Sequence, residues 1–142
     1  MVKKINWTKL SNYYIFSVIW GIIILILSGI PGSSAPKISF LNIPYSDKIL
    51  HASFYFILAF LILTEKSTNE KLTLRSKIFV IIIATIYGIL IEILQKYVFI
   101  QRTSETLDAI CNMIGAALSA IIFERTFKLK NYIITNLFKI FS

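Results

Sequence analysis

Long apolar stretches without charge are the feature of this sequence that most restricts its fold. From Tyr13 to Ile30 the chain carries no charged residue over 18 positions, about the length that crosses the hydrocarbon core of a bilayer as a helix. Only 15% of the residues are charged, whereas a soluble domain usually has about a quarter. A water-facing surface cannot be made from this composition, so we expect an all-α membrane protein.

Four apolar stretches divide the chain. We predict transmembrane helices over residues of about 13–30, 47–64, 78–98 and 107–123, within a single domain that covers 1–142. A segment rich in Pro, Gly and Ser follows the first stretch, and these residues break helices. The first apolar run is longer than the hydrophobic region of a typical cleaved signal peptide, so we expect it to be retained.

The C-terminal tail differs from these spans. Over residues of about 126–141, apolar side chains recur at helical spacing and polar ones form an opposing stripe, which is typical of an amphipathic helix in the membrane interface. A fifth span is the alternative, but the tail is too polar for it. The predicted fold is therefore four transmembrane helices plus a C-terminal amphipathic interfacial helix.

The distribution of basic residues predicts the orientation. Eleven Lys and Arg lie in the N-terminal arm, the 65–77 connection and the tail, against four on the other side. Basic residues collect on the cytoplasmic side, so we expect both termini in the cytoplasm. Because these charges flank apolar runs, the net charge of +8 indicates contact with a lipid bilayer and not with nucleic acid. The single cysteine, Cys111, excludes an internal disulfide and is interpreted as a packing residue.

Polar and ionisable residues gather near one predicted membrane boundary. Residues at positions i, i+3, i+4 or i+8 share a helix face, and ionisable groups below the headgroups usually face the bundle interior or a wet cavity. We therefore predict an outward-opening polar pocket, with no metal or cofactor. Its candidate residues are Asp47, His51, Tyr55, Glu92, Gln95, Arg102, Asp108 and Asn112.

Each of these residues also has a structural interpretation. Asp47 and Asp108 suit helix starts, while His51 and Tyr55 suit packing. Gln95 and Asn112 can hydrogen-bond between helices, and Glu92 can form an ion pair with Arg102. These alternatives stay open, although independent structural residues need not gather on one face of the membrane.

The same residues carry a resemblance to a known family. The stretches PYSDKILHASFY (44–55) and YGILIEILQKYVFIQRTSETLDAICNMIGA (87–116) closely resemble the VanZ-like family of bacterial membrane proteins. The matching positions are Asp47, Lys48, His51, Tyr55, Glu92, Gln95, Arg102, Asp108, Asn112 and Gly115. The resemblance implies a protein of the bacterial inner membrane and cell envelope, in a family whose founding member is associated with teicoplanin resistance and to which no reaction is firmly assigned.

Three functions fit this sequence. We favour a pocket that binds an extracytoplasmic lipid-linked or peptidoglycan-related ligand, with Arg102 attracting an anionic head. An intramembrane enzyme that uses His51 and carboxylates is the second, with a divalent metal held by His51, Glu92 and Asp108 as a variant. The sequence contains no nucleophile elbow, HExxH motif or Gly-rich phosphate loop, which favours binding over catalysis. The third is a structural or assembly role.

Overall fold

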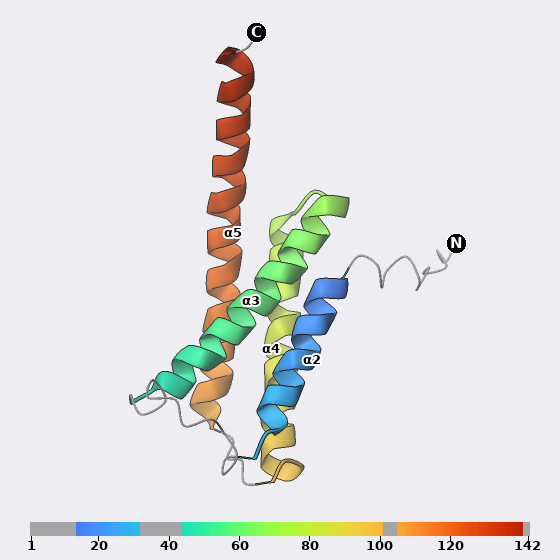
Figure 1. Ribbon diagram of the computed structural model, residues 1–142, viewed down its shortest axis with the longest axis vertical. Helices are drawn as coiled ribbons and strands as arrows, with labels where there is room; N and C mark the ends of the chain where they lie inside the picture. The colour runs from blue at the N-terminus through green and yellow to red at the C-terminus, as the bar shows by residue number, and fades with distance from the viewer. Residues whose placement is uncertain (1–13, 32–43, 101–104, 141–142) are drawn as a thin grey trace, which may run out of the picture.

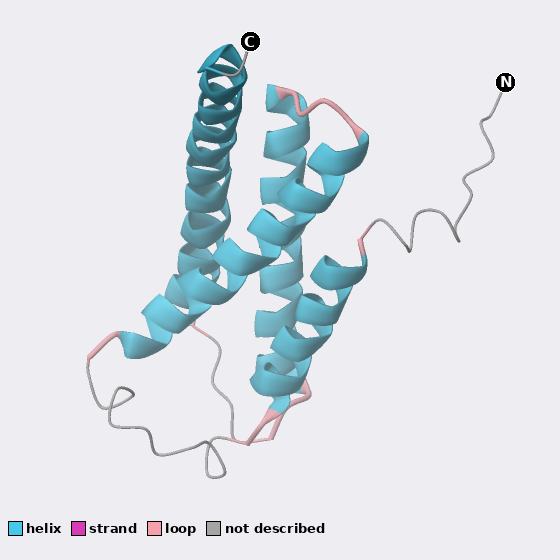
Figure 2. Ribbon diagram, turned by 45° about the horizontal axis from the view of Figure 1, so that its top comes forward, coloured by secondary structure: helices cyan, strands magenta, loops and turns pink. Residues whose placement is uncertain are grey.

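The chain folds into a small bundle of helices (Figure 1). The computed structural model describes residues 14–31, 44–100 and 105–140, with side chains for all of these except 69 and 127–140. Four helices make up most of this part: α2 (Ile15–Gly29), α3 (Ser46–Asn69), α4 (Leu74–Tyr97) and α5 (Thr106–Ile140). The described ranges contain no strand, as Figure 2 shows by colour. The all-helical prediction is confirmed.

Three of the helices are long and apolar enough to cross a membrane. These are α4 and the segments Ser46–Thr68 of α3 and Thr106–Thr126 of α5. Their outer surfaces carry large apolar side chains, such as Ile86 (52% exposed) and Ile121 (52% exposed). Polar side chains such as Asn112 and Ser119 are completely buried. An apolar exterior around polar interior residues is the arrangement suited to lipid.

α2 is apolar but shorter than the other helices, at 15 residues. At about 1.5 Å per residue, its length of roughly 22 Å is less than the hydrocarbon thickness of about 30 Å. The prediction of a first transmembrane span over 13–30 therefore remains a prediction, and residue 13 lies outside the described residues.

The predicted separation between a fourth span and an interfacial helix is not observed. α5 continues as one straight helix from Thr106 to Ile140 (Figure 1). No Gly or Pro occurs after Gly115, so nothing in the local sequence interrupts the backbone hydrogen bonds of the helix. The apolar stripe in the tail indicated an amphipathic helix, but it gave no information on whether that helix was joined to the span before it.

The closest helix contact joins α3 to α5. A Cβ atom built on Gly115 would collide with the carbonyl oxygen of Ala52 and would lie 2.8 Å from the carbonyl carbon of Ala52. Only glycine fits at this position. Small residues allow helix backbones in a membrane to approach closely, and here the approach brings the N-terminal halves of α3 and α5 together.

α2 is held to the bundle by polar groups from two other helices. The buried carboxylate of Glu65, on α3, accepts a hydrogen bond from the backbone N–H of Phe16 at 2.7 Å and a longer one from Ser17. The first N–H groups of a helix have no partner within it, and a carboxylate there satisfies them. The indole of Trp20 donates to the Phe54 carbonyl at 3.0 Å, and the hydroxyl of Tyr87, on α4, donates to the Gly21 carbonyl at 2.7 Å.

Replacing Gly115 by Ala is expected to destabilise the bundle by about 3 kcal/mol, because an added methyl group in a tight contact forces the backbones apart. Gly21→Ala is the matched control, since its added Cβ would lie 3.9 Å from the Tyr87 hydroxyl in ordinary contact. Unfolding in mixed micelles measures both variants. Equal stabilities for the two would contradict the close contact between α3 and α5.

Candidate functional site

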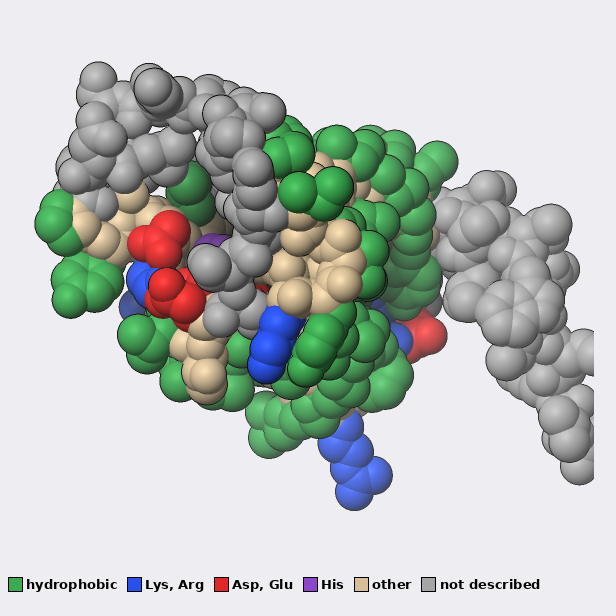
Figure 3. Space-filling model, turned by 90° about the horizontal axis from the view of Figure 1, so that it is seen from below, with side chains coloured by type: hydrophobic (Ala, Val, Ile, Leu, Met, Phe, Trp, Pro, Cys, Tyr) green, Lys and Arg blue, Asp and Glu red, His purple; other side chains and the backbone are tan. Residues whose placement is uncertain are grey.

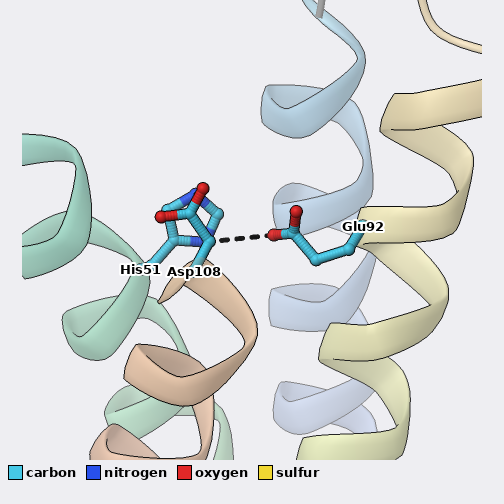
Figure 4. A group of neighbouring side chains, drawn as sticks. All are labelled: His51, Glu92 and Asp108. Atoms are coloured by element: carbon cyan, nitrogen blue, oxygen red, sulfur yellow. Dashed lines mark ion pairs between the residues drawn. The ribbon is translucent and has the colours of Figure 1, made fainter. Parts of the chain in front are cut away.

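Four polar side chains from three helices converge at one end of the bundle. This is the end at which α2 and α4 finish and α3 and α5 begin (Figure 1). His51 lies in the second turn of α3, Glu92 lies near the end of α4, and Asp108 and Asn112 occupy successive turns at the start of α5. Figure 4 shows His51, Glu92 and Asp108 pointing toward one another. The i, i+4 spacing of Asp108 and Asn112 directs both side chains to the same face of α5.

The imidazole of His51 lies among three of these oxygen-bearing groups. Its Nδ1 atom is 3.1 Å from the amide oxygen of Asn112 and 3.8 Å from a carboxylate oxygen of Glu92. Its Nε2 atom is 4.0 Å from Asp108 Oδ2. An amide oxygen can only accept a hydrogen bond, so Nδ1 carries a proton and donates it to Asn112. In the neutral ring, the lone pair of Nε2 is then left on the side of Asp108.

Lys48 connects the exposed rim of this site, formed by Asp47 and Glu105, to the buried Asp108. Its ammonium group lies 2.8 Å from Asp108 Oδ1, 2.7 Å from Asp47 and 2.5 Å from Glu105. Asp47 and Glu105 are more than half exposed, whereas the Asp108 side chain is only 8% exposed. Figure 3 looks onto this end of the molecule, where acidic side chains lie beside basic ones with the histidine partly visible behind them. The polar cluster therefore runs from the surface into the bundle.

The floor of the site is a packed junction of three helices. A Cβ atom on Gly88, in α4, would lie 2.9 Å from the amide nitrogen of Asn112 and 3.2 Å from the ring of Tyr55. Asn112 is fully buried and Tyr55 is 1% exposed. The absence of a side chain at Gly88 thus gives Asn112 the space in which its amide oxygen faces His51.

The donor atoms of the site can hold a cation. One ligand atom from each of His51, Glu92 and Asp108 lies within 4.8 Å of the other two, and the same is true of Asp47, Glu105 and Asp108. The second group already surrounds the ammonium of Lys48. The first group combines an imidazole with two carboxylates whose residues are each only 5% exposed, which is a chemically distinct set of ligands.

The structure brings most of the predicted site residues together. Asp47, His51, Glu92, Asp108 and Asn112 form the connected cluster described above. Tyr55 lies in the packed floor, and its hydroxyl has no hydrogen-bond partner among the described residues.

Two predicted members of the pocket stand apart from this cluster. The amide nitrogen of Gln95 lies 3.5 Å from the Ser28 carbonyl of α2, so Gln95 links two helices. Arg102, with its predicted ion pair to Glu92, lies outside the described residues.

Two contributors were not among the predicted pocket residues. Lys48 belonged to the family pattern but not to the predicted pocket, and Glu105 was not singled out. Glu105 directly precedes α5, and its backbone carbonyl accepts a hydrogen bond from the N–H of Asp108 at 3.0 Å. Its position three residues before Asp108 is the signal in the sequence that indicates this proximity.

Comparisons with known proteins found no matching family model, no matching curated protein and no matching solved structure.

Lys48→Met is expected to cost about 3 kcal/mol of stability, because it leaves the buried Asp108 carboxylate without its cation. The double variant Lys48→Met/Asp108→Asn removes that charge as well and is expected to regain most of the loss. Lys66→Met is the control, since Lys66 pairs with the exposed Glu70 one turn away on the surface. The free energy of unfolding in mixed micelles is measured for the unmodified protein and for each of these variants. A double variant as unstable as the single one would contradict the pairing.

Proposed function

We propose that this chain is a VanZ-like integral membrane protein of the bacterial cell envelope, whose polar site binds an extracytoplasmic lipid-linked or peptidoglycan-related ligand. In this proposal α2 is a fourth span, the protein lies in the cytoplasmic membrane and both termini are cytoplasmic. The site then opens to the outside. The charge distribution in the sequence and the resemblance of residues 44–55 and 87–116 to the VanZ-like family support this assignment.

One observation carries the proposal. The exposed fraction of the polar side chains decreases stepwise from the surface of the cluster to its interior. Asp47 and Glu105 are 56% and 53% exposed at the rim, the His51 side chain is 20% exposed, and the Glu92 side chain is 6% exposed. Residues that only hold helices together need no path to the surface. A site that takes a ligand from outside needs both an exposed rim and buried groups that fix its orientation.

The charge of the cluster limits the chemistry of the ligand. Among the described residues, the carboxylates of Asp47, Glu105 and Asp108 share the ammonium of Lys48, and the carboxylate of Glu92 lies deeper, beside His51. Such a cluster favours a cation or a donor of hydrogen bonds over a bare anion. The amines, amides and hydroxyl groups of cell-wall precursors are donors of this kind. In our proposal Arg102 receives the anionic part of the ligand, and the carboxylates recognise its donors.

A second candidate function is an intramembrane enzyme. The observation that favours it is the position of the His51 ring between two buried carboxylates, with its Nδ1 proton directed to Asn112. An imidazole oriented in this way can act as a general acid or base. The two functions differ in what they require of His51. Catalysis needs a titratable ring, whereas binding needs only a polar group of similar shape.

The proposal is tested in cells whose only copy of the protein is expressed from a plasmid. The measurement is their susceptibility to teicoplanin and other envelope antibiotics. Glu92→Gln and Asp47→Asn are expected to return susceptibility to the level of the empty vector, because each removes a ligand-orienting charge. Glu124→Gln is the matched control, since it breaks the ion pair with Lys77 near the opposite end of α4.

Protein levels and thermal stability are measured on the same variants. Loss of phenotype with intact stability supports a ligand site, while full activity of both site variants would rule it out. Loss of stability in parallel with loss of phenotype would favour a structural role for these residues. His51→Gln separates the two leading candidates, since a binding site retains activity with it and an enzyme does not.

A further inference from the structure

We propose that His51, Glu92 and Asp108 bind one divalent transition-metal ion in the interior of the bundle. This inference goes beyond the proposed function and does not depend on it, because metal binding is a property of the purified chain. The three side chains come from three different helices and direct their donor atoms toward one another (Figure 4).

The spacing of the donor atoms suits a metal better than direct hydrogen bonds. Glu92 lies 3.8 Å from Nδ1 of His51, and Asp108 Oδ2 lies 4.0 Å from Nε2. Charge-assisted hydrogen bonds between such groups are about 2.7–2.9 Å long, so neither carboxylate bonds the ring directly. Donors bound to one ion at about 2.0–2.2 Å lie roughly 3.4 Å apart in a tetrahedral site. One ligand atom from each of the three residues lies within 4.8 Å of the other two, so a contraction of at most about 1.4 Å would produce this geometry.

Neighbouring residues already orient two of the ligands. Asn112 accepts the Nδ1 proton of His51, which leaves the lone pair of Nε2 available. A metal-bound histidine usually donates its other N–H to an acceptor of this kind. Lys48 holds Oδ1 of Asp108, which leaves Oδ2 on the side of the imidazole. The supporting contacts therefore select the donor atoms that face each other.

The electrostatics of the cluster also favour a cation. The carboxylates of Glu92 and Asp108 are buried, and their ligand atoms lie within 4.8 Å of each other. Two buried like charges at this separation repel strongly. A divalent ion bound by both carboxylates would replace this repulsion with attraction to one shared cation.

A buried hydroxyl beside the cluster points to a hydrated ligand. Tyr55 is 1% exposed, its hydroxyl has no hydrogen-bond partner among the described residues, and its ring lies against Gly88 beside Asn112. Buried polar atoms ordinarily have partners. Water bound to a metal in this cluster would supply one, because three protein ligands leave an open coordination position.

The ligand set selects the kind of metal. One imidazole nitrogen and two carboxylate oxygens suit Zn²⁺ or Mn²⁺. Ca²⁺ takes six to eight oxygen ligands and Mg²⁺ retains most of its water, so both are expected to bind more weakly.

The experiment uses the full chain, purified in detergent and stripped with a chelator. Isothermal titration with Zn²⁺ is expected to give one site per chain. His51→Ala, Glu92→Gln and Asp108→Asn should each remove this binding, and Asn112→Ala should weaken it about tenfold. Glu124→Gln and the rim variant Asp47→Asn/Glu105→Gln should retain it. Absence of a stoichiometric site, or binding lost only in the rim variant, would overturn the proposal.

A second measurement separates ligation from folding. With Co²⁺ as the probe, His51→Cys is expected to add a thiolate-to-cobalt charge-transfer band, while Glu124→Cys is not. A role of His51 in packing alone predicts the same spectrum for both variants, and that result would contradict the site.

Discussion

The close contact between α3 and α5 is the constraint on which the rest of the structure depends. At Gly115 the backbone of α5 meets that of Ala52 with no room for a side chain. This contact lies one residue from His51 on α3 and one turn from Asn112 on α5. It therefore fixes the positions from which the polar side chains of both helices reach each other. α4 completes the junction through Gly88, whose missing side chain makes room for Asn112.

The bundle places charge inside and apolar surface outside, so its polar residues must satisfy one another. Glu65 does this by accepting the first N–H groups of α2, and Lys48 does it by pairing with three carboxylates. The His51, Glu92 and Asp108 cluster differs from these cases, since its donor atoms lie about an ångström too far apart for direct hydrogen bonds. This difference separates the candidate site from polar contacts that only hold helices together.

Much of this arrangement was predictable from the sequence, and the limits have physical causes. Apolar runs located the three helices that can span a membrane, because burial in lipid requires long apolar stretches. They did not locate the helix ends. α3 continues to Asn69, beyond the predicted residue 64, and this extension includes Glu65, whose carboxylate accepts the first N–H groups of α2. α4 begins at Leu74, before the predicted residue 78, because the Thr73 hydroxyl caps its first turn.

Helical spacing predicted that Asp47, His51, Glu92, Asp108 and Asn112 share one end of the bundle. It could not predict that Lys48 turns inward or that Gln95 faces α2, because these depend on how each helix is rotated against its neighbours.

Anomalous X-ray diffraction from crystals grown with Zn²⁺ tests whether the three side chains bind a metal ion. We expect an anomalous peak bonded to His51, Glu92 and Asp108. Intact helices with no peak there, and with both carboxylates hydrogen-bonded directly to His51, would contradict it.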